Sequence, residues 1–483
     1  MLTQTRLRSA LLGSGAAVAL LMPSAAAAAD DIDGLKDQIQ TLQDRLDQIE
    51  QDQAAIDERT QGLAPAALLV TGGDIEGSFK LPGSDTSMKI GGLIKADFFY
   101  DFDTNVDALG PSFYFASIPL DGTTQSNRDG EFAFHARQSF LQIETSTPSE
   151  FGEITTVFAF DFLTGTGDEN TLNAFQPRVL YAYGSIGPVL AGHDWSTFTD
   201  WSSYPTTVDF FGPVGEPSVY QALIRYTQDL GDGLVVKLAL ENPETVGIAT
   251  PLVPGTTTTV GTGSYVSISD PTGFVTSAAT ASGGPDSYPD AVIKFEYDQS
   301  WGHLGLAGIF RELSVDDGAG LQDSAFGWGF LAGLWAPTFG DDSLNAHFVF
   351  GEGIGRYVLG SFYDVEVAGF ANGAFTDVDP IEVWAFHVGY NHWWTDSLAS
   401  NVVYGYLHNN WDVTRLHGPN STTQTGVATT FLNEDVQSVH ANILWYPADP
   451  VTIGLEYIWG ARHTISNAVA SNSRVQMSFW YTF

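Results

Sequence analysis

The basic residues of this chain fall at positions from which they could guide anions. The 483-residue sequence has 19 Lys and Arg against 57 Asp and Glu, a net charge of −38. Many of the basic residues alternate with apolar neighbours at the period of two that separates the two faces of a β-strand. They are Lys95, Arg137, Arg178, Arg225, Lys237, Lys294, Arg311, Arg462 and Arg474.

Two explanations account for these cations. If the apolar face of each strand meets lipid, a Lys or Arg on that face costs about 2–4 kcal/mol near mid-membrane, so an inward position is expected whatever the function. Each cation would then pair with an acid on the same face. The candidate acids are Asp97, Asp161, Glu241, Glu296 and Glu456. In the other explanation several of the cations line a narrow anion path, and the sequence leaves both open.

The sequence shows no pattern of a catalytic or metal site. It has no Cys, which excludes disulfides, thiolate ligands and Cys nucleophiles. It also lacks a Gly-x-Ser-x-Gly elbow and a His-Glu-x-x-His motif, and its ten His are dispersed. We therefore expect no catalytic residue, no metal and no cofactor. The acidic balance argues against nucleic acid as a partner.

The C-terminal strand indicates what surrounds the chain. Phe479, Tyr481 and Phe483 share one face of an alternating segment, and polar residues occupy most of the other. A core strand of a soluble all-β protein is the alternative, but a transmembrane β-barrel requires this pattern. The ending resembles the signal read by the bacterial outer-membrane barrel assembly machinery. Expected partners are therefore this machinery, outer-membrane lipid and lipopolysaccharide.

Residues 1–29 have the layout of a secretory signal peptide. Arg6 and Arg8 precede an apolar run over 10–22 and a small-residue stretch over 24–29. No later stretch approaches the roughly 20 apolar residues of a membrane helix, so a membrane-embedded chain must form a closed barrel.

Residues 30–61 carry a heptad pattern that predicts a periplasmic coiled coil. Asp, Gln, Glu, Lys and Arg fill most positions outside a narrow apolar seam, whereas an amphipathic helix lying on its own domain is the alternative. The seam residues are Ile32, Leu35, Ile39, Leu42, Leu46, Ile49, Gln53 and Ile56.

After a linker over 62–87, apolar and polar residues alternate along segments of the chain from 88 to 483. We count about sixteen strand-like segments, with a parity change around His135–Thr145 that leaves fourteen or eighteen open. Short turns alternate with long connections, the layout of an outer-membrane barrel with both termini in the periplasm. The prediction is an all-β antiparallel transmembrane barrel, wide enough for an aqueous channel.

The third long connection, 195–218, is too apolar for a fully solvated loop. We expect it to fold inward and narrow the channel; a contact between subunits or a lid over the rim is the alternative. Its candidate constriction residues are Trp195, Phe198, Asp200, Trp201, Tyr204, Asp209, Phe210 and Phe211.

Several stretches resemble the DcaP-like trimeric porins, most strongly between Phe79 and Gly215. These stretches are Phe79–Gly92, Lys95–Asp101, Ala136–Ser139, Gly192–Asp200 and Asp209–Pro213. The resemblance implies a sixteen-stranded homotrimer with a coiled-coil extension that passes small anionic solutes such as dicarboxylates. The expected function is an outer-membrane porin. The alternative is a structural barrel whose coil spaces or tethers the membrane against the periplasmic wall.

Overall fold

The structure is a computed structural model of the chain. It describes residues 40–48, 51, 71–103, 113–127, 130–163, 167–168, 174–249, 287–316, 322–368, 377–412 and 432–483. The chain divides into two units, residues 1–70 with 82–84, and residues 71–81 with 85–483.

The first unit is helical over residues 40–48, where Leu42 and Leu46 of the predicted seam are solvent-exposed. The remaining predicted seam residues and the predicted signal peptide lie outside the described residues. These seam residues are Ile32, Leu35, Ile39, Ile49, Gln53 and Ile56. Within the described ranges, no helix combines the length and the apolar character needed to cross a membrane.

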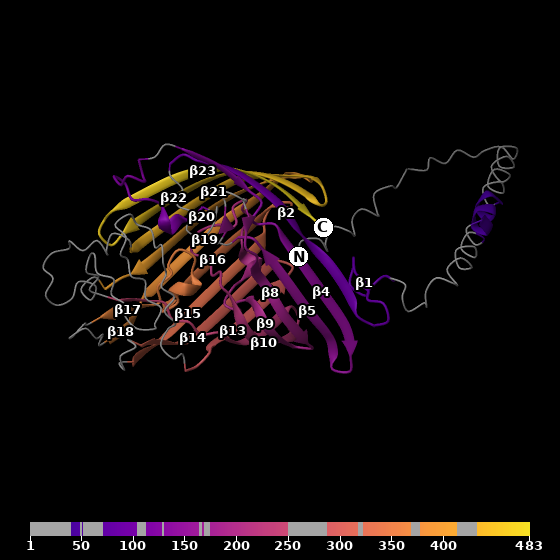
Figure 1. Cartoon of the computed structure of the whole chain (residues 1–483), viewed down its shortest axis with the longest axis horizontal. Helices are drawn as coiled ribbons and strands as arrows, with labels where there is room; N and C mark the ends of the chain where they lie inside the picture. Colours follow the sequence, from indigo (N-terminus) through magenta and orange to yellow (C-terminus); the bar gives the residue numbers. More distant parts are fainter. Residues whose placement is uncertain are drawn as a thin grey trace. The chain divides into compact units, whose positions relative to one another are not determined.

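The second unit is built on one large antiparallel sheet (Figure 1). Its first strands are β2 (Ser87–Asp101), β3 (Glu131–His135), β4 (Phe140–Ser149), β5 (Gly152–Asp161), β8 (Arg178–Ile186), β9 (Val189–Trp195), β10 (Tyr220–Gly231) and β11 (Leu234–Glu241). It continues with β13 (Asp290–Gln299), β14 (Gly302–Asp316), β15 (Gln322–Pro337), β16 (Ser343–Glu352), β19 (Glu382–Thr395), β20 (Leu398–Asn410), β21 (Asn433–Ala448), β22 (Val451–Thr464) and β23 (Val469–Thr482).

Short elements accompany this sheet. The strands are β1 (Phe79–Lys80), β6 (Gly167–Asp168), β7 (Ala174–Phe175), β12 (Gly247–Ala249), β17 (Val365–Ala368) and β18 (Asp377–Pro380). The 3-10 turns are η2 (Phe115–Ser117), η3 (Trp201–Ser203) and η4 (Gly355–Tyr357). β1 pairs with β2, so the segment predicted as linker already contributes to the sheet.

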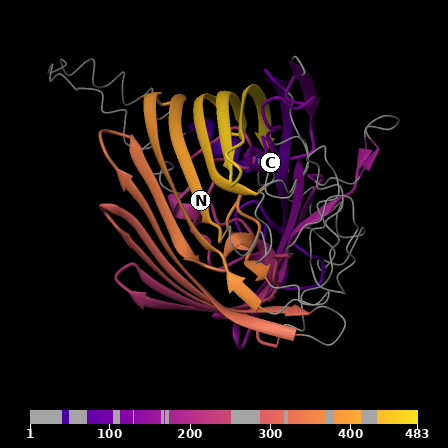
Figure 2. The same cartoon turned by 90° about the vertical axis from the view of Figure 1, so that its left-hand side faces the viewer.

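The sheet closes on itself because β2 pairs with β23, from Leu93 opposite Thr482 to Asp101 opposite Arg474 (Figure 2). β3 and β4 both pair with β2, on successive parts of it, and act as one wall strand interrupted at 136–139. The shift in the alternation of apolar and polar residues around His135–Thr145 corresponds to this interruption. Counted in this way, the described part of the chain forms the predicted sixteen-stranded closed barrel.

The outward face follows the predicted alternation. On β22, Leu455 and Tyr457 are exposed while Glu456 between them is fully buried. Because side chains alternate along a strand, every second one points away from the barrel. These outward side chains are apolar or aromatic around most of the barrel. Short turns join strands at one end. The connections at the other end are mostly longer, as the sequence predicts, but 317–321 and 465–468 are as short as turns.

The alternation of apolar and polar residues along the strands suggests a polar, hydrated inner surface. The inward face is instead apolar in part. Ile309, Leu331 and Val349 point inward from β14, β15 and β16 and are fully buried. They belong to an apolar core shared with Phe198 and Tyr357, which come from connections between strands. The chain's own loops therefore cover part of the inner wall.

A buried ion pair joins β2 to β23, where the barrel closes. Arg474 donates to both carboxylate oxygens of Asp101, at 2.8 and 2.9 Å, and both side chains are fully buried. Breaking a buried pair by removing one partner costs about 3–5 kcal/mol. We expect Asp101→Asn to lower the unfolding temperature of the barrel, measured by heat-modifiable electrophoretic mobility. Asp103→Asn, an exposed position two residues further on, should leave it unchanged; equal transitions would contradict this role of the seam.

Candidate pore constriction

The third connection, residues 196–219 between β9 and β10, lies against the inner wall. The Asp200 carboxylate is 3.1 Å from Lys294 Nζ on β13 and 3.1 Å from His303 Nε2 on β14. Gly333 on β15 permits this approach, because a Cβ there would overlap the Asp200 carboxylate and Ser203 Oγ. Contacts with strands far away in the sequence therefore hold the first half of the connection against the wall.

The second half of the connection is fixed to the other side of the barrel. The backbone N–H groups of Val208 and Asp209 donate to the Glu456 carboxylate on β22, at 2.9 and 3.1 Å. Lys95 Nζ on β2 donates to the Val208 carbonyl at 2.6 Å. The connection thus contacts the inner face from β13 to β2.

Two carboxyls of this connection differ in ionisation. Burial raises the pKa of Asp200, but the hydrogen bond from His303 and the charge of Lys294 outweigh it and leave the pKa below its usual range. Burial raises the pKa of Glu216 well above its usual range. Asp200 is therefore a charged anchor, whereas burial favours the neutral form of Glu216.

Among the described residues, two further connections contact the third one inside the barrel, and the sequence did not predict them. In the sixth, residues 353–381, Leu359 exchanges backbone hydrogen bonds with Gly215 and Glu216 at 3.0 and 2.9 Å. In the first, residues 102–130, the Phe113 N–H donates to Asp209 Oδ2 at 3.1 Å. The apolar run 113–115 carries the compositional signal used for the third connection and could have revealed the first.

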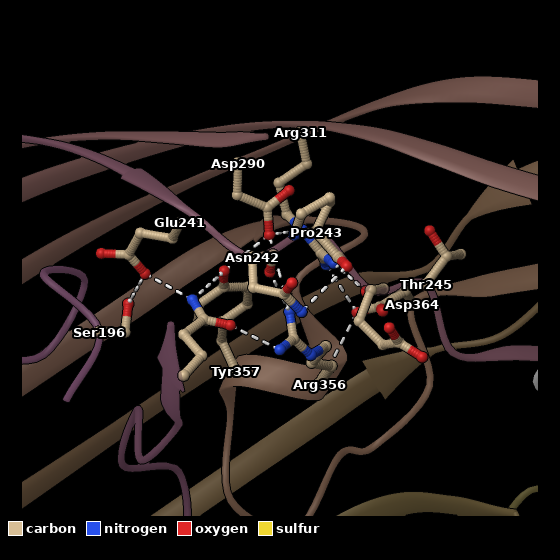
Figure 3. Close-up of polar contacts among 12 residues, drawn as sticks. Ser196, Glu241, Asn242, Pro243, Thr245, Asp290, Arg311, Arg356, Tyr357 and Asp364 are labelled. Carbon is tan, nitrogen blue, oxygen red and sulfur yellow. Dashed lines mark hydrogen bonds and ion pairs between the residues drawn. The ribbon is translucent and has the colours of Figure 1, made fainter. Parts of the chain in front are cut away.

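A buried polar cluster fixes the sixth connection (Figure 3). Arg311 on β14 contacts Asp290 Oδ2 at 3.0 Å and Asp364 Oδ1 at 2.9 Å, and the Tyr357 hydroxyl donates to Asp290 at 2.6 Å. Arg356 in η4, which the sequence analysis missed, reaches Gln221 and lies 3.7 Å from Asp290. Arg311 is thus a structural anchor of this connection.

Most of the predicted lumen cations lie beside carboxylates. Among the described residues, these ion pairs are Lys95 with Asp97, Arg178 with Asp161, Arg225 with Asp194, Lys237 with Glu296, Lys294 with Asp200 and Glu296, Arg311 with Asp290 and Asp364, and Arg474 with Asp101 and Asp209. Arg137 and Arg462 are buried; Arg137 lies over the Phe175 ring, and Arg462 donates to the Ile118 carbonyl and to Asn433. Two of the predicted acids have roles other than pairing with a predicted cation. Glu241 accepts a hydrogen bond from Ser196, and Glu456 accepts a backbone hydrogen bond from the third connection.

Accessibility separates the paired cations into two sets. The side chains of Arg178, Lys237 and Arg225 are 33%, 24% and 14% exposed, whereas the other paired cations on the wall strands are at most 4% exposed. The accessible set lies on β8, β10 and β11, and we call it the basic wall.

Aromatic residues of the third connection lie near the basic wall. Arg178 Cζ is 5.5 Å from the centroid of the Phe210 ring. Trp201 is exposed, and its ring centroid lies 4.4 Å from that of Trp195 at the end of β9. Of the remaining predicted constriction residues, Phe198 is fully buried and Tyr204 packs against His347 and His387.

A closed sixteen-stranded barrel with an apolar outer band and inward-folded connections defines the class of porin-type channels of the bacterial outer membrane. The chain belongs to the porin subfamily, whose family model matches residues 76–479. It is thus an integral outer-membrane protein, and its family and fold are those of a channel, not of an enzyme. A search among curated proteins finds no match.

Solved structures show the same fold. The outer membrane channel DcaP of Acinetobacter baumannii is 18% identical with a TM-score of 0.64, over 86% of this chain and 100% of that one. The predicted resemblance to DcaP-like porins is confirmed. OmpT, an outer membrane protein of Vibrio cholerae, is 11% identical with a TM-score of 0.46, over 82% of this chain and 98% of that one. An anion-selective porin from Comamonas acidovorans is 10% identical with a TM-score of 0.46, over 82% and 100%. The last two likenesses are too weak to support a conclusion about this chain.

Proposed function

We propose that this porin passes small anionic solutes along the basic wall, where Arg225 is hydrogen-bonded to Thr197 of the third connection at 2.9 Å. The observation that carries the proposal is the unequal exposure within the pairs of the basic wall. Arg178 is 33% exposed but its partner Asp161 only 2%, and Lys237 is 24% exposed against 17% for Glu296. In the third pair Arg225 is 14% and Asp194 12% exposed. The greater exposure of the cation is thus clear in the pairs of Arg178 and Lys237.

The overall net charge of −38 does not oppose this proposal. Exposed charges on the outer connections are screened beyond about 8 Å at physiological salt. Charges in a narrow, protein-walled passage are screened less and weigh more in ion preference. The choice of dicarboxylates as the solute class rests on the family resemblance.

Recordings of the purified protein in planar bilayers test the proposal. We expect stepwise conductance and, in a salt gradient, a reversal potential that indicates modest anion preference. A clearly cation-selective channel would sink the anion proposal. The absence of conductance steps would instead favour the structural barrel that tethers the membrane.

We also propose that the chain forms a homotrimer, with its helical segments packed in a coil between subunits. Leu42 and Leu46 are exposed along one side of helix 40–48, as an unpartnered seam would be. Four heptads are few, so the barrel walls should supply most of the association. Deleting residues 30–61 should therefore leave trimers intact on non-denaturing gels. Dissociation to monomers after the deletion would show that the coil is the main oligomerisation element.

A further inference from the structure

Three potential metal ligands converge on the outer face of the barrel, at the end that carries the long connections. The pairing of β21 with β22 shifts register between Asn433 and Asp435, so Glu434 and Asp435 together oppose His463. A bulge of this kind re-aims a side chain that regular alternation would send to the other face. It thereby brings two carboxylates beside one imidazole.

The spacing of these three groups is that of ligands around an ion. His463 Nδ1 lies 3.7 Å from Glu434 Oε2 and 3.7 Å from Asp435 Oδ2, too far for hydrogen bonds. All three ligand atoms lie within 4.8 Å of one another. Bonds of about 2.0–2.2 Å from N and O to a tetrahedral Zn²⁺ place neighbouring ligand atoms roughly 3.4 Å apart. A small side-chain movement would close the site.

Neighbouring groups already orient one of the ligands. Asp435 Oδ1 accepts hydrogen bonds from the Tyr406 hydroxyl at 2.5 Å and from His408 Nδ1 at 2.8 Å. The other oxygen, Oδ2, is left facing His463. Such outer hydrogen bonds fix the direction of a ligand and commonly contribute 10–100-fold to metal affinity.

We propose that Glu434, Asp435 and His463 form a binding site for a divalent transition metal of the Zn²⁺ type. One imidazole nitrogen with two carboxylates suits such an ion, whereas Ca²⁺ and Mg²⁺ prefer six or more oxygen ligands. The side chains of Glu434 and His463 are 41% and 35% exposed, so water can reach the ion and fill its remaining positions.

Calorimetric titration of Zn²⁺ into untagged, chelator-treated full-length protein in detergent tests the site. We expect one ion bound per chain and a more than tenfold loss of affinity in His463→Gln. Glu434→Gln, at an exposed position whose change should not disturb folding, should weaken binding in the same direction. His408→Gln should cost about 10–100-fold by releasing Asp435.

His392 supplies the matched control. Its Nδ1 lies 2.8 Å from Asp342 Oδ2 near the short turns. His392 is 40% exposed and Asp342 10%, and no further ligand is assigned to this pair among the described residues. His392→Gln should bind Zn²⁺ as the wild type does. The proposal is overturned if the wild type binds no Zn²⁺, if binding survives both the His463 and Glu434 changes, or if Ca²⁺ binds there as tightly.

Discussion

Replacing Arg178, Arg225 and Lys237 together by Gln should convert the channel from anion to cation preference. Each substitution removes a positive charge but leaves its partner, which is Asp161, Asp194 or Glu296 in turn. The passage would thus become more negative by three charges at the wall where solute passes. Because such charges are poorly screened, we expect the reversal potential in a salt gradient to change sign.

A control separates this local effect from a change in net charge. Lys80 on β1 pairs with Asp74 at 3.1 Å and is 30% exposed, similar to Arg178. Lys80→Gln should leave ion preference unaltered, whereas Arg178→Gln alone should shift it part of the way. If the two single variants behave alike, the basic wall does not set selectivity.

Replacing Asp200 by Asn should release the first half of the third connection and raise single-channel conductance. Asp200 is a buried anion held by Lys294 and His303, and removing one partner of a buried pair costs about 3–5 kcal/mol. The anchored residues 199–204 would then leave the wall for part of the time. Bilayer recordings should show larger and noisier steps than those of the wild type.

Glu216→Gln is the matched comparison within the same connection. Because burial raises the pKa of Glu216 and so favours its uncharged form, a neutral amide resembles this carboxyl more closely than it resembles the charged Asp200. We expect wild-type conductance from this variant. Equal effects of the Asp200 and Glu216 changes would contradict the assignment of Asp200 as the charged anchor.

The pH dependence of the two carboxyls has opposite signs. The pKa of Asp200 is depressed in the folded protein, so its contribution is present above the ordinary carboxyl pKa and is lost only as pH falls through the lowered value. The raised pKa of Glu216 means that its neutral form is lost as pH rises through the raised value. The Asp200 anchor should therefore hold through the mildly acidic range.

The sequence by itself determined the barrel. Alternation of side chains is a local property of each strand, so rows such as Leu455 and Tyr457 reveal the lipid-facing side without knowledge of any partner. The lengths of successive connections are likewise read directly from the chain. The interruption at 136–139 was visible as a change of parity, although only the pairing of β3 and β4 with β2 reduced the possible counts to sixteen.

Only the tertiary structure decided how the interior is divided. Residues that meet there are far apart in the chain, as Arg311 and Asp364 are, and as Gly333 is from the Asp200 carboxylate it accommodates. No local pattern encodes such contacts. The same holds for the predicted lumen cations, which in the sequence all occupy inward-facing positions of their strands. Whether each is an anchor beneath a loop or part of the exposed basic wall depends on which connections fold over it, and that follows from packing across the whole barrel.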